Sequence, residues 1–141
     1  MTSPSSTTDV WHIGSTPLHS RFLLGTAGYP SPDVLRQAIE ASGSQVLTLG
    51  LKRTLAAPGG GDNGFVQIIR DTAQAHGAHL LPNTAGCRSA QEAITLAHMA
   101  RELLGTHWIK LEVVGDEQTL QPDPFELVAA AAQLIRDGFE V

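Results

Sequence analysis

Cysteine is almost absent from this sequence of 141 residues: Cys87 is the single one, so no disulfide can form within the chain. A chain without disulfides fits the reducing cytosol, and we expect a cytoplasmic protein. Basic residues are also few, 9 against 14 acidic ones, which leaves no basic surface to neutralise a nucleic acid. No apolar run approaches the roughly 20 residues of a membrane-spanning helix, and Met1 to Thr8 lack the features of a secretory signal. We therefore expect neither a nucleic-acid partner nor a membrane.

Apolar residues are plentiful, at 42% of the sequence, and suffice for the core of one globular domain. We expect residues 1–9 to form a flexible polar tail and residues 10–141 to form the domain. A short hairpin is predicted between Val10 and Ser20. Further strands are predicted to begin near residues 22, 45, 79, 108 and 139. Apolar residues at helical spacing predict four helices between and after these strands. The N-cap signals of these helices are Ser31, Asp62 or Asn63, Ser89 and Asp123.

This alternation of strands and helices implies parallel strands with helices packed against them, which is an α/β fold. Two architectures fit the pattern, a doubly wound sheet and a (βα)8 barrel. A complete barrel needs roughly 250 residues, so four βα units and the start of a fifth strand correspond to about half of one.

The stretch from His107 to Val114 is predicted to be the fourth of these strands. Because successive side chains on a strand point to opposite faces, it presents one apolar face and one polar face. The apolar face holds Ile109, Leu111 and Val113, and the other face holds Trp108, Lys110 and Glu112. In an exposed antiparallel strand the second face would be an ordinary polar surface. In a buried parallel sheet the two charges are costly unless they are paired or used.

A barrel would give Lys110 and Glu112 a chemical role. The face away from the helices points into the barrel, where burial favours the neutral amine of a lysine. A neutral amine attacks a ketone and forms an imine. Glu112, one layer further along the same face, could then move protons on the neighbouring carbons, or it could simply pair with Lys110.

Other candidate sites are weaker. The segment from Gly59 to Gly64 matches the dinucleotide-binding pattern but does not directly follow a strand, so we interpret Pro58 to Gly64 as a βα loop. Lys52 and Arg53 follow the second strand as a solvated pair or as a contact for phosphate or carboxylate. Cys87 has no base nearby in the sequence, which favours a packing role over a nucleophile. The six histidines form no metal-type pair, and we expect no metal.

Three stretches of the sequence together resemble the thiazole synthase of thiamine biosynthesis. They run from Ser20 to Thr26, from Leu80 to Cys87, and from Ile109 to Asp116. The resemblance extends from about Val10 to Val141. It implies a (βα)8 barrel enzyme that condenses 1-deoxy-D-xylulose 5-phosphate, dehydroglycine (iminoacetate) and sulfur from the thiocarboxylate of a sulfur-carrier protein. The product is a carboxylated thiazole phosphate.

The resemblance also implies roles for individual residues. Lys110 would form the Schiff base with the sugar ketone, and Glu112 would assist in proton transfer. Asn83 and Thr84 would bind substrate. The family implies no cofactor, and its full-length members are expected to be homo-oligomers.

The sequence departs from the family in a few places. Ala27 and Gly28 stand where the family often has Gly-Lys, Lys52 and Arg53 vary a common Val-Arg-Arg, and Gln121 replaces a usual leucine. The family continues for roughly another half barrel, which carries a second acidic residue and the phosphate-binding loops. We therefore predict the N-terminal half of a (βα)8 barrel, ending at the start of strand five. The alternatives are an inactive half barrel that needs a complementing chain and, more weakly, another lysine-imine barrel of aldolase type.

Overall fold

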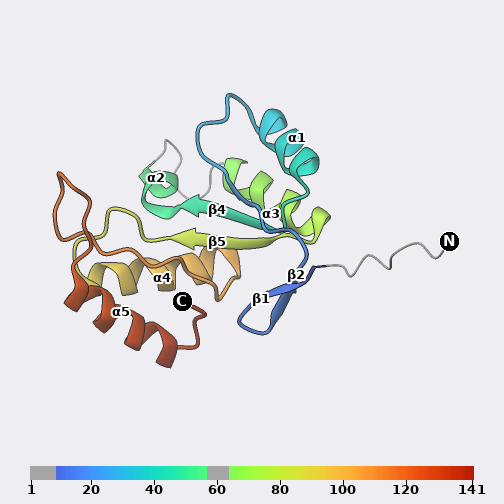
Figure 1. The fold of residues 1–141 in the computed structure, drawn as a ribbon. Coiled ribbons are helices and arrows are strands. Elements are labelled where there is room, and N and C mark those ends of the chain that lie inside the picture. The colour runs from blue at the N-terminus through green and yellow to red at the C-terminus, as the bar shows by residue number, and fades with distance from the viewer. Residues whose placement is uncertain (1–8, 57–63) are drawn as a thin grey trace.

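The computed structural model describes residues 9–56 and 64–141 and shows a mixed α/β fold (Figure 1). The strands are β1 (Trp11–Ile13), β2 (Thr16–Leu18), β3 (Leu23–Gly25), β4 (Val46–Gly50) and β5 (His79–Asn83). The helices are α1 (Pro32–Ser42), α2 (Leu51–Ala56), α3 (Gly64–His76), α4 (Ala90–Leu104) and α5 (Pro124–Arg136). The predictions for residues 1–8 and for nearly all of the glycine-rich loop lie outside the described residues.

The central sheet is parallel, as predicted, and its strands lie in the order β3-β4-β5. Two later segments extend this order. Lys110 forms a parallel bridge with Asn83 at the edge of β5, and Trp108 forms a parallel bridge with Glu140. The order in space therefore follows the order along the chain, from β3 to the C-terminal residues. The predicted hairpin is also confirmed, because β1 pairs with β2 in antiparallel fashion.

The continuous strand predicted from His107 to Val114 is wrong in its extent, because this segment makes only isolated bridges. The cause lies in β5. Lys110 donates its N–H to the carbonyl of Pro82 at 2.8 Å, so the backbone nitrogen of Pro82 faces the same segment. Proline has no N–H to donate, and one bond of the ladder cannot form. Two residues before Pro82, the Trp108 N–H does not donate directly to the Leu80 carbonyl. The Thr106 hydroxyl connects them, accepting from the Trp108 N–H and donating to the Leu80 carbonyl.

Helix α2 was not predicted, because in the sequence the apolar run of the second strand continues to Leu51. In the structure β4 ends at Gly50 and α2 begins at Leu51. The side chain of Leu51 is buried against the helices, and the Thr54 hydroxyl donates to the Gly50 carbonyl. The apolar run of the sequence continues through Leu51, but the strand ends at Gly50 because Leu51 is buried among the helices.

Three predicted N-caps are confirmed: Ser31, Ser89 and Asp123 each accept a backbone N–H of the first turn. The N-cap predicted at Asp62 or Asn63 lies outside the described residues. Ser89 and Glu92 have the spacing of a capping box, which is half formed. Glu92 donates its N–H to the Ser89 hydroxyl, but its carboxylate accepts the N–H of Arg88 instead of that of Ser89.

The helices pack against one face of the sheet. Leu24, Leu47 and Leu80, from the three strands, share a buried cluster with residues of α1, α2, α3, α4 and α5. Figure 1 shows α1 and α3 beside β4, and α4 and α5 beside β5, and residues of all four helices belong to this one cluster. The opposite face of the sheet carries a separate cluster of Leu18, Val46 and Trp108.

The hairpin of β1 and β2 covers one end of that opposite face. Leu18, from β2, is fully buried against Trp108, which also stacks on His79 with ring centroids 4.8 Å apart. The indole N–H of Trp11 donates to the Ser20 carbonyl at 2.9 Å. The hairpin thus seals the end of the face at which the parallel strands begin, and leaves the other end accessible.

We expect Leu18→Ala to lower the free energy of unfolding by about 2–5 kcal/mol, because it opens a cavity beneath Trp108. Val128→Ala is the matched control, since Val128 lies 67% exposed on α5 and its truncation should change stability by less than about 0.5 kcal/mol. Urea unfolding followed by tryptophan fluorescence measures both. Equal effects of the two substitutions would show that the hairpin does not pack as described.

Candidate functional site

Lys110 and Glu112 lie on the same face of the sheet, as the alternation predicts. Their neighbours Ile109 and Val113 are buried on the helix side, 2% and 1% exposed. Lys110 Nζ lies 3.8 Å from Glu112 Oε1, and the two side chains are 56% and 39% exposed. The pairing is confirmed, but the described residues do not bury the ammonium as a barrel interior would.

The backbone around Lys110 is fixed by β5. Its N–H donates to the Pro82 carbonyl at 2.8 Å, and its carbonyl accepts the Thr84 N–H at 3.2 Å. On the other edge, Ile109 donates to the Glu140 carbonyl at 3.0 Å. The backbone at Lys110 is therefore fixed by hydrogen bonds to the segments on both of its edges.

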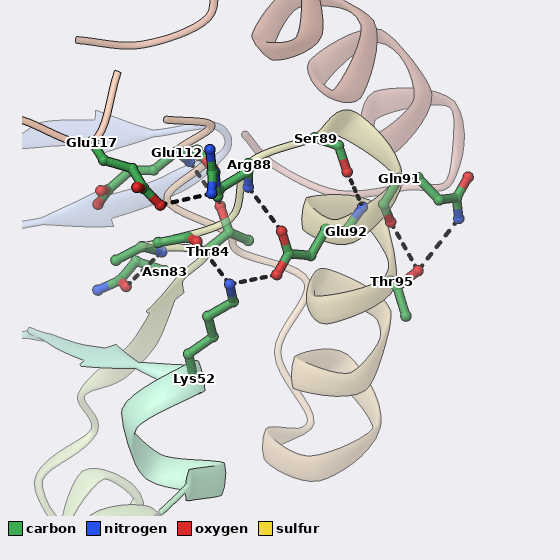
Figure 2. A network of polar contacts seen from close by, with 12 residues as sticks. Lys52, Asn83, Thr84, Arg88, Ser89, Gln91, Glu92, Thr95, Glu112 and Glu117 are labelled. Carbon is green, nitrogen blue, oxygen red and sulfur yellow. Dashed lines mark hydrogen bonds and ion pairs between the residues drawn. The ribbon is translucent and has the colours of Figure 1, made fainter. Parts of the chain in front are cut away.

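Glu112 is held differently, by one side chain. Its N–H donates to the Thr84 hydroxyl and its carbonyl accepts from the same hydroxyl, both at 2.8 Å. Thr84 is fully buried, and Figure 2 shows it beside Glu112. Thr84 was predicted to bind substrate, and its contact with Glu112 was not predicted. The signal that could have found it is Pro82, which interrupts the backbone ladder two residues earlier.

Asn83 lies beside Lys110 at the end of β5. Its Oδ1 accepts the N–H of Ala85 at 3.2 Å, and no described residue bonds its Nδ2. It lines a hollow of about 490 Å³ at the ends of β3, β4 and β5, together with Thr48, Gly50 and Arg53. Asn83 therefore lines a space large enough for a small ligand and has amide donors that no described residue occupies.

Lys52 is engaged within the protein. Its ammonium donates to the Gly86 carbonyl at 2.7 Å and pairs with Glu92 (Figure 2). The hydrogen bond from Lys52, then that from the Arg88 N–H, holds the pKa of Glu92 below its usual range. The side chain of Arg88 reaches Glu117 at 2.7 Å, in the loop that follows segment 107–114. These contacts tie α2, the β5–α4 turn and that loop together.

Arg53 contrasts with Lys52. It is exposed, lines the same hollow as Asn83, and makes no hydrogen bond or ion pair within residues 9–56 and 64–141. Of the two cations predicted to follow the second strand, Arg53 is the one that remains available to an anionic ligand.

Cys87 is a packing residue in this structure. It is fully buried in the helix-side cluster, and burial raises the pKa of its thiol. A raised pKa disfavours the thiolate that a nucleophile needs. Among the described residues, no group of three or more His, Cys, Asp or Glu side chains could hold a metal ion. In the same part of the chain, no helix combines the length and apolar character needed to cross a bilayer.

The site as a whole is one primary amine beside one carboxylate, next to a polar hollow. An amine of this kind can form an imine with a ketone or aldehyde, and the carboxylate can relay protons.

A sequence model of one family, the thiazole biosynthesis protein ThiG, matches residues 12–141. The thiazole synthase of Coxiella burnetii is 52% identical over 132 residues, which make up 94% of this chain and 49% of that protein. The thiazole synthase of Variovorax paradoxus is 56% identical over 125 residues, covering 87% of this chain and 44% of the relative. That of Erwinia tasmaniensis is 56% identical over 122 residues, covering 86% and 44%. The chain thus spans about half the length of these relatives.

We expect Glu92→Gln to reduce the loss of free energy of unfolding that occurs as the pH falls below neutrality. Because the pKa of Glu92 is lower in the folded chain, its stabilisation is present above the unfolded value of about 4.3 and is lost as the pH falls through the folded pKa. The carboxylate is largely exposed, so we expect a contribution below about 1 kcal/mol. Urea unfolding at about pH 7 and about pH 3 measures it. Lys52→Met should reduce the same pH-dependent loss of stability. If the difference in free energy of unfolding between the two pH values is unchanged in both variants, the Lys52–Glu92 interaction is not its cause.

Cys87 should react slowly with a thiol reagent in the folded chain. Burial both blocks access and raises the pKa of the thiol, so we expect labelling at neutral pH to be on the order of 100-fold slower than in the urea-unfolded chain. Mass spectrometry after timed quenching gives both rates. Similar rates in the two states would mean that Cys87 is exposed.

Proposed function

Because the chain belongs to the family of the thiazole biosynthesis protein ThiG, we propose that it carries the amine-bearing part of a thiazole synthase site. The observation that carries the proposal is the Lys110–Glu112 pair, 3.8 Å apart on the face that the helices leave free. The substrates we propose are 1-deoxy-D-xylulose 5-phosphate, dehydroglycine and the thiocarboxylate of a sulfur-carrier protein.

The proposed architecture is the first half of a (βα)8 barrel. It is supported by the parallel arrangement of β3, β4, β5 and the segments at Lys110 and Glu140, which are neighbours in space in the order in which they follow one another along the chain. It is also supported by the packing of all the helix clusters on one face, because a doubly wound sheet carries helices on both faces. The strand ends that approach Lys110 are those at which barrel enzymes place their active sites.

The proposed chemistry begins with Lys110. Its neutral amine adds to the ketone carbon of the sugar phosphate and forms a C–N bond. The ketone oxygen then leaves as water with the two amine protons, which gives the imine. Glu112 accepts the proton that the ammonium must first release and passes it to water; as a carboxylate again, it then removes a proton from the carbon next to the imine. Dehydroglycine and the thiocarboxylate then supply nitrogen and sulfur.

Asn83 supplies the proposed substrate contact beside Lys110. It lines the hollow, and its Nδ2, which no described residue bonds, can donate to a substrate oxygen there. Thr84 follows it, and a direct contact of Thr84 with substrate remains a prediction from the sequence alone.

A second candidate is a half site that works only with a complementing chain. The observation in its favour is that the chain spans about half the length of its relatives. The remaining half of such a protein would add partner surfaces, and assembly into a homo-oligomer is part of this proposal.

The test exploits the fact that the sequence contains only two lysines, Lys52 and Lys110. Incubation with 1-deoxy-D-xylulose 5-phosphate followed by borohydride should reduce the imine to a stable amine, and peptide mass spectrometry should place it on Lys110. Lys110→Arg keeps the charge but should abolish the adduct. Lys52→Arg is the matched control and should retain it.

The same trapping is repeated with the second half of the Coxiella burnetii thiazole synthase supplied as a separate chain. An adduct that forms only in this mixture favours the complemented half site. An adduct that persists in Lys110→Arg, or forms in neither preparation, rules out Lys110 as the imine-forming residue.

A further inference from the structure

Thr84, the residue at which β5 leaves the sheet, takes part in four hydrogen bonds. Two ladder bonds lead up to it: Lys110 donates its N–H to the Pro82 carbonyl, and Thr84 donates its N–H to the Lys110 carbonyl. A regular parallel ladder would continue with Glu112 donating to the Thr84 carbonyl. Instead the chain turns, and the Thr84 carbonyl accepts the N–H of Cys87 at 3.1 Å.

The Thr84 hydroxyl takes over the bonds that the turn removes. It accepts the N–H of Glu112 and donates its single proton to the Glu112 carbonyl, each at 2.8 Å. One side chain thus satisfies both backbone groups of Glu112, so that Glu112 stays in register although β5 has ended. Because a hydroxyl can accept one hydrogen bond and donate another from the same atom, the arrangement is specific for a hydroxyl.

The same contact determines where the Glu112 carboxylate lies. The direction of a strand side chain follows from its backbone, and Glu112 has its backbone held at both polar groups. Its carboxylate then reaches to 3.8 Å from Lys110 Nζ. The Thr84 N–H also holds the Lys110 carbonyl, so one residue sets both members of the pair.

We propose that Thr84 is a positioning residue that holds Glu112 beside Lys110, and that it acts through Glu112 and not by touching substrate. This inference rests on the proposed imine chemistry. Thr84 is fully buried and does not line the hollow, and its hydroxyl proton is already donated, which leaves no proton for a ligand.

Two substitutions separate the hydroxyl from the volume of the side chain. Thr84→Val keeps the branched shape and removes the hydroxyl, whereas Thr84→Ser keeps the hydroxyl and removes the methyl group. A packing role predicts the larger loss in Thr84→Ser, and a positioning role predicts it in Thr84→Val. We expect Thr84→Val to slow trapping of the Lys110 adduct by roughly 10-fold or more, and Thr84→Ser to stay within about 3-fold of the unsubstituted chain.

A double-substitution cycle shows whether Thr84 acts through Glu112. In a Glu112→Gln background the carboxylate is already lost, so adding Thr84→Val should change the trapping rate by less than about 2-fold. A loss of roughly 10-fold in that background would overturn the proposal, because it would show a general structural effect.

Hydrogen exchange tests the contact without any reaction. The Glu112 amide should exchange at least about 10-fold faster in Thr84→Val than in the unsubstituted chain, and near the original rate in Thr84→Ser. The Leu47 amide, in β4, is the internal reference. Equal protection of Glu112 in all three chains overturns the positioning role. If the unsubstituted chain forms no adduct, the proposed function fails, and the exchange result alone then decides whether Thr84 holds Glu112.

Discussion

The arrangement of this protein depends on how a proline is accommodated in the middle of its sheet. Pro82 lies in β5, with strands or bridging segments on both sides, and it cannot donate to segment 107–114. The sheet tolerates it because hydroxyl groups stand on either side of the gap. Thr106 relays the bond between Trp108 and Leu80, and Thr84 holds Glu112. The backbone carbonyl of Pro82 remains available, and it is the group that fixes Lys110.

The contacts around the site depend on where β5 ends. Once β5 has turned away at Thr84, its next residues must be held by something other than the sheet. The Cys87 carbonyl accepts the Val114 N–H at 2.7 Å, and Lys52 binds the Gly86 carbonyl from α2. Figure 2 shows the ammonium of Lys52 reaching Glu92, in the first turn of α4, which also accepts the N–H of Arg88. The β5–α4 turn is therefore anchored to segment 107–114 on one side and to α2 on the other.

The features that could be predicted from the sequence are those set by local chemistry. The caps at Ser31 and Asp123 were predicted because short polar side chains satisfy helix N–H groups wherever a helix begins. The common face of Lys110 and Glu112 was predicted because alternation depends only on an extended backbone. The features that were missed depend on partners distant in the sequence. Helix α2 begins where Leu51 meets the helix-side core, and the sequence before and after Leu51 does not record that burial.

The exposure of Lys110 links the fold to the chemistry. Imine formation needs a neutral amine, and proteins obtain one chiefly by removing the group from water. Lys110 is 56% exposed, because β1 and β2 seal only the end of the face at which the strands begin. The described residues thus supply the position of the amine and of its carboxylate partner, but not the dry surroundings. For the proposed imine chemistry, those surroundings would have to come from whatever covers the open face, so that the geometry of the pair and its reactivity would be set by separate parts of the protein.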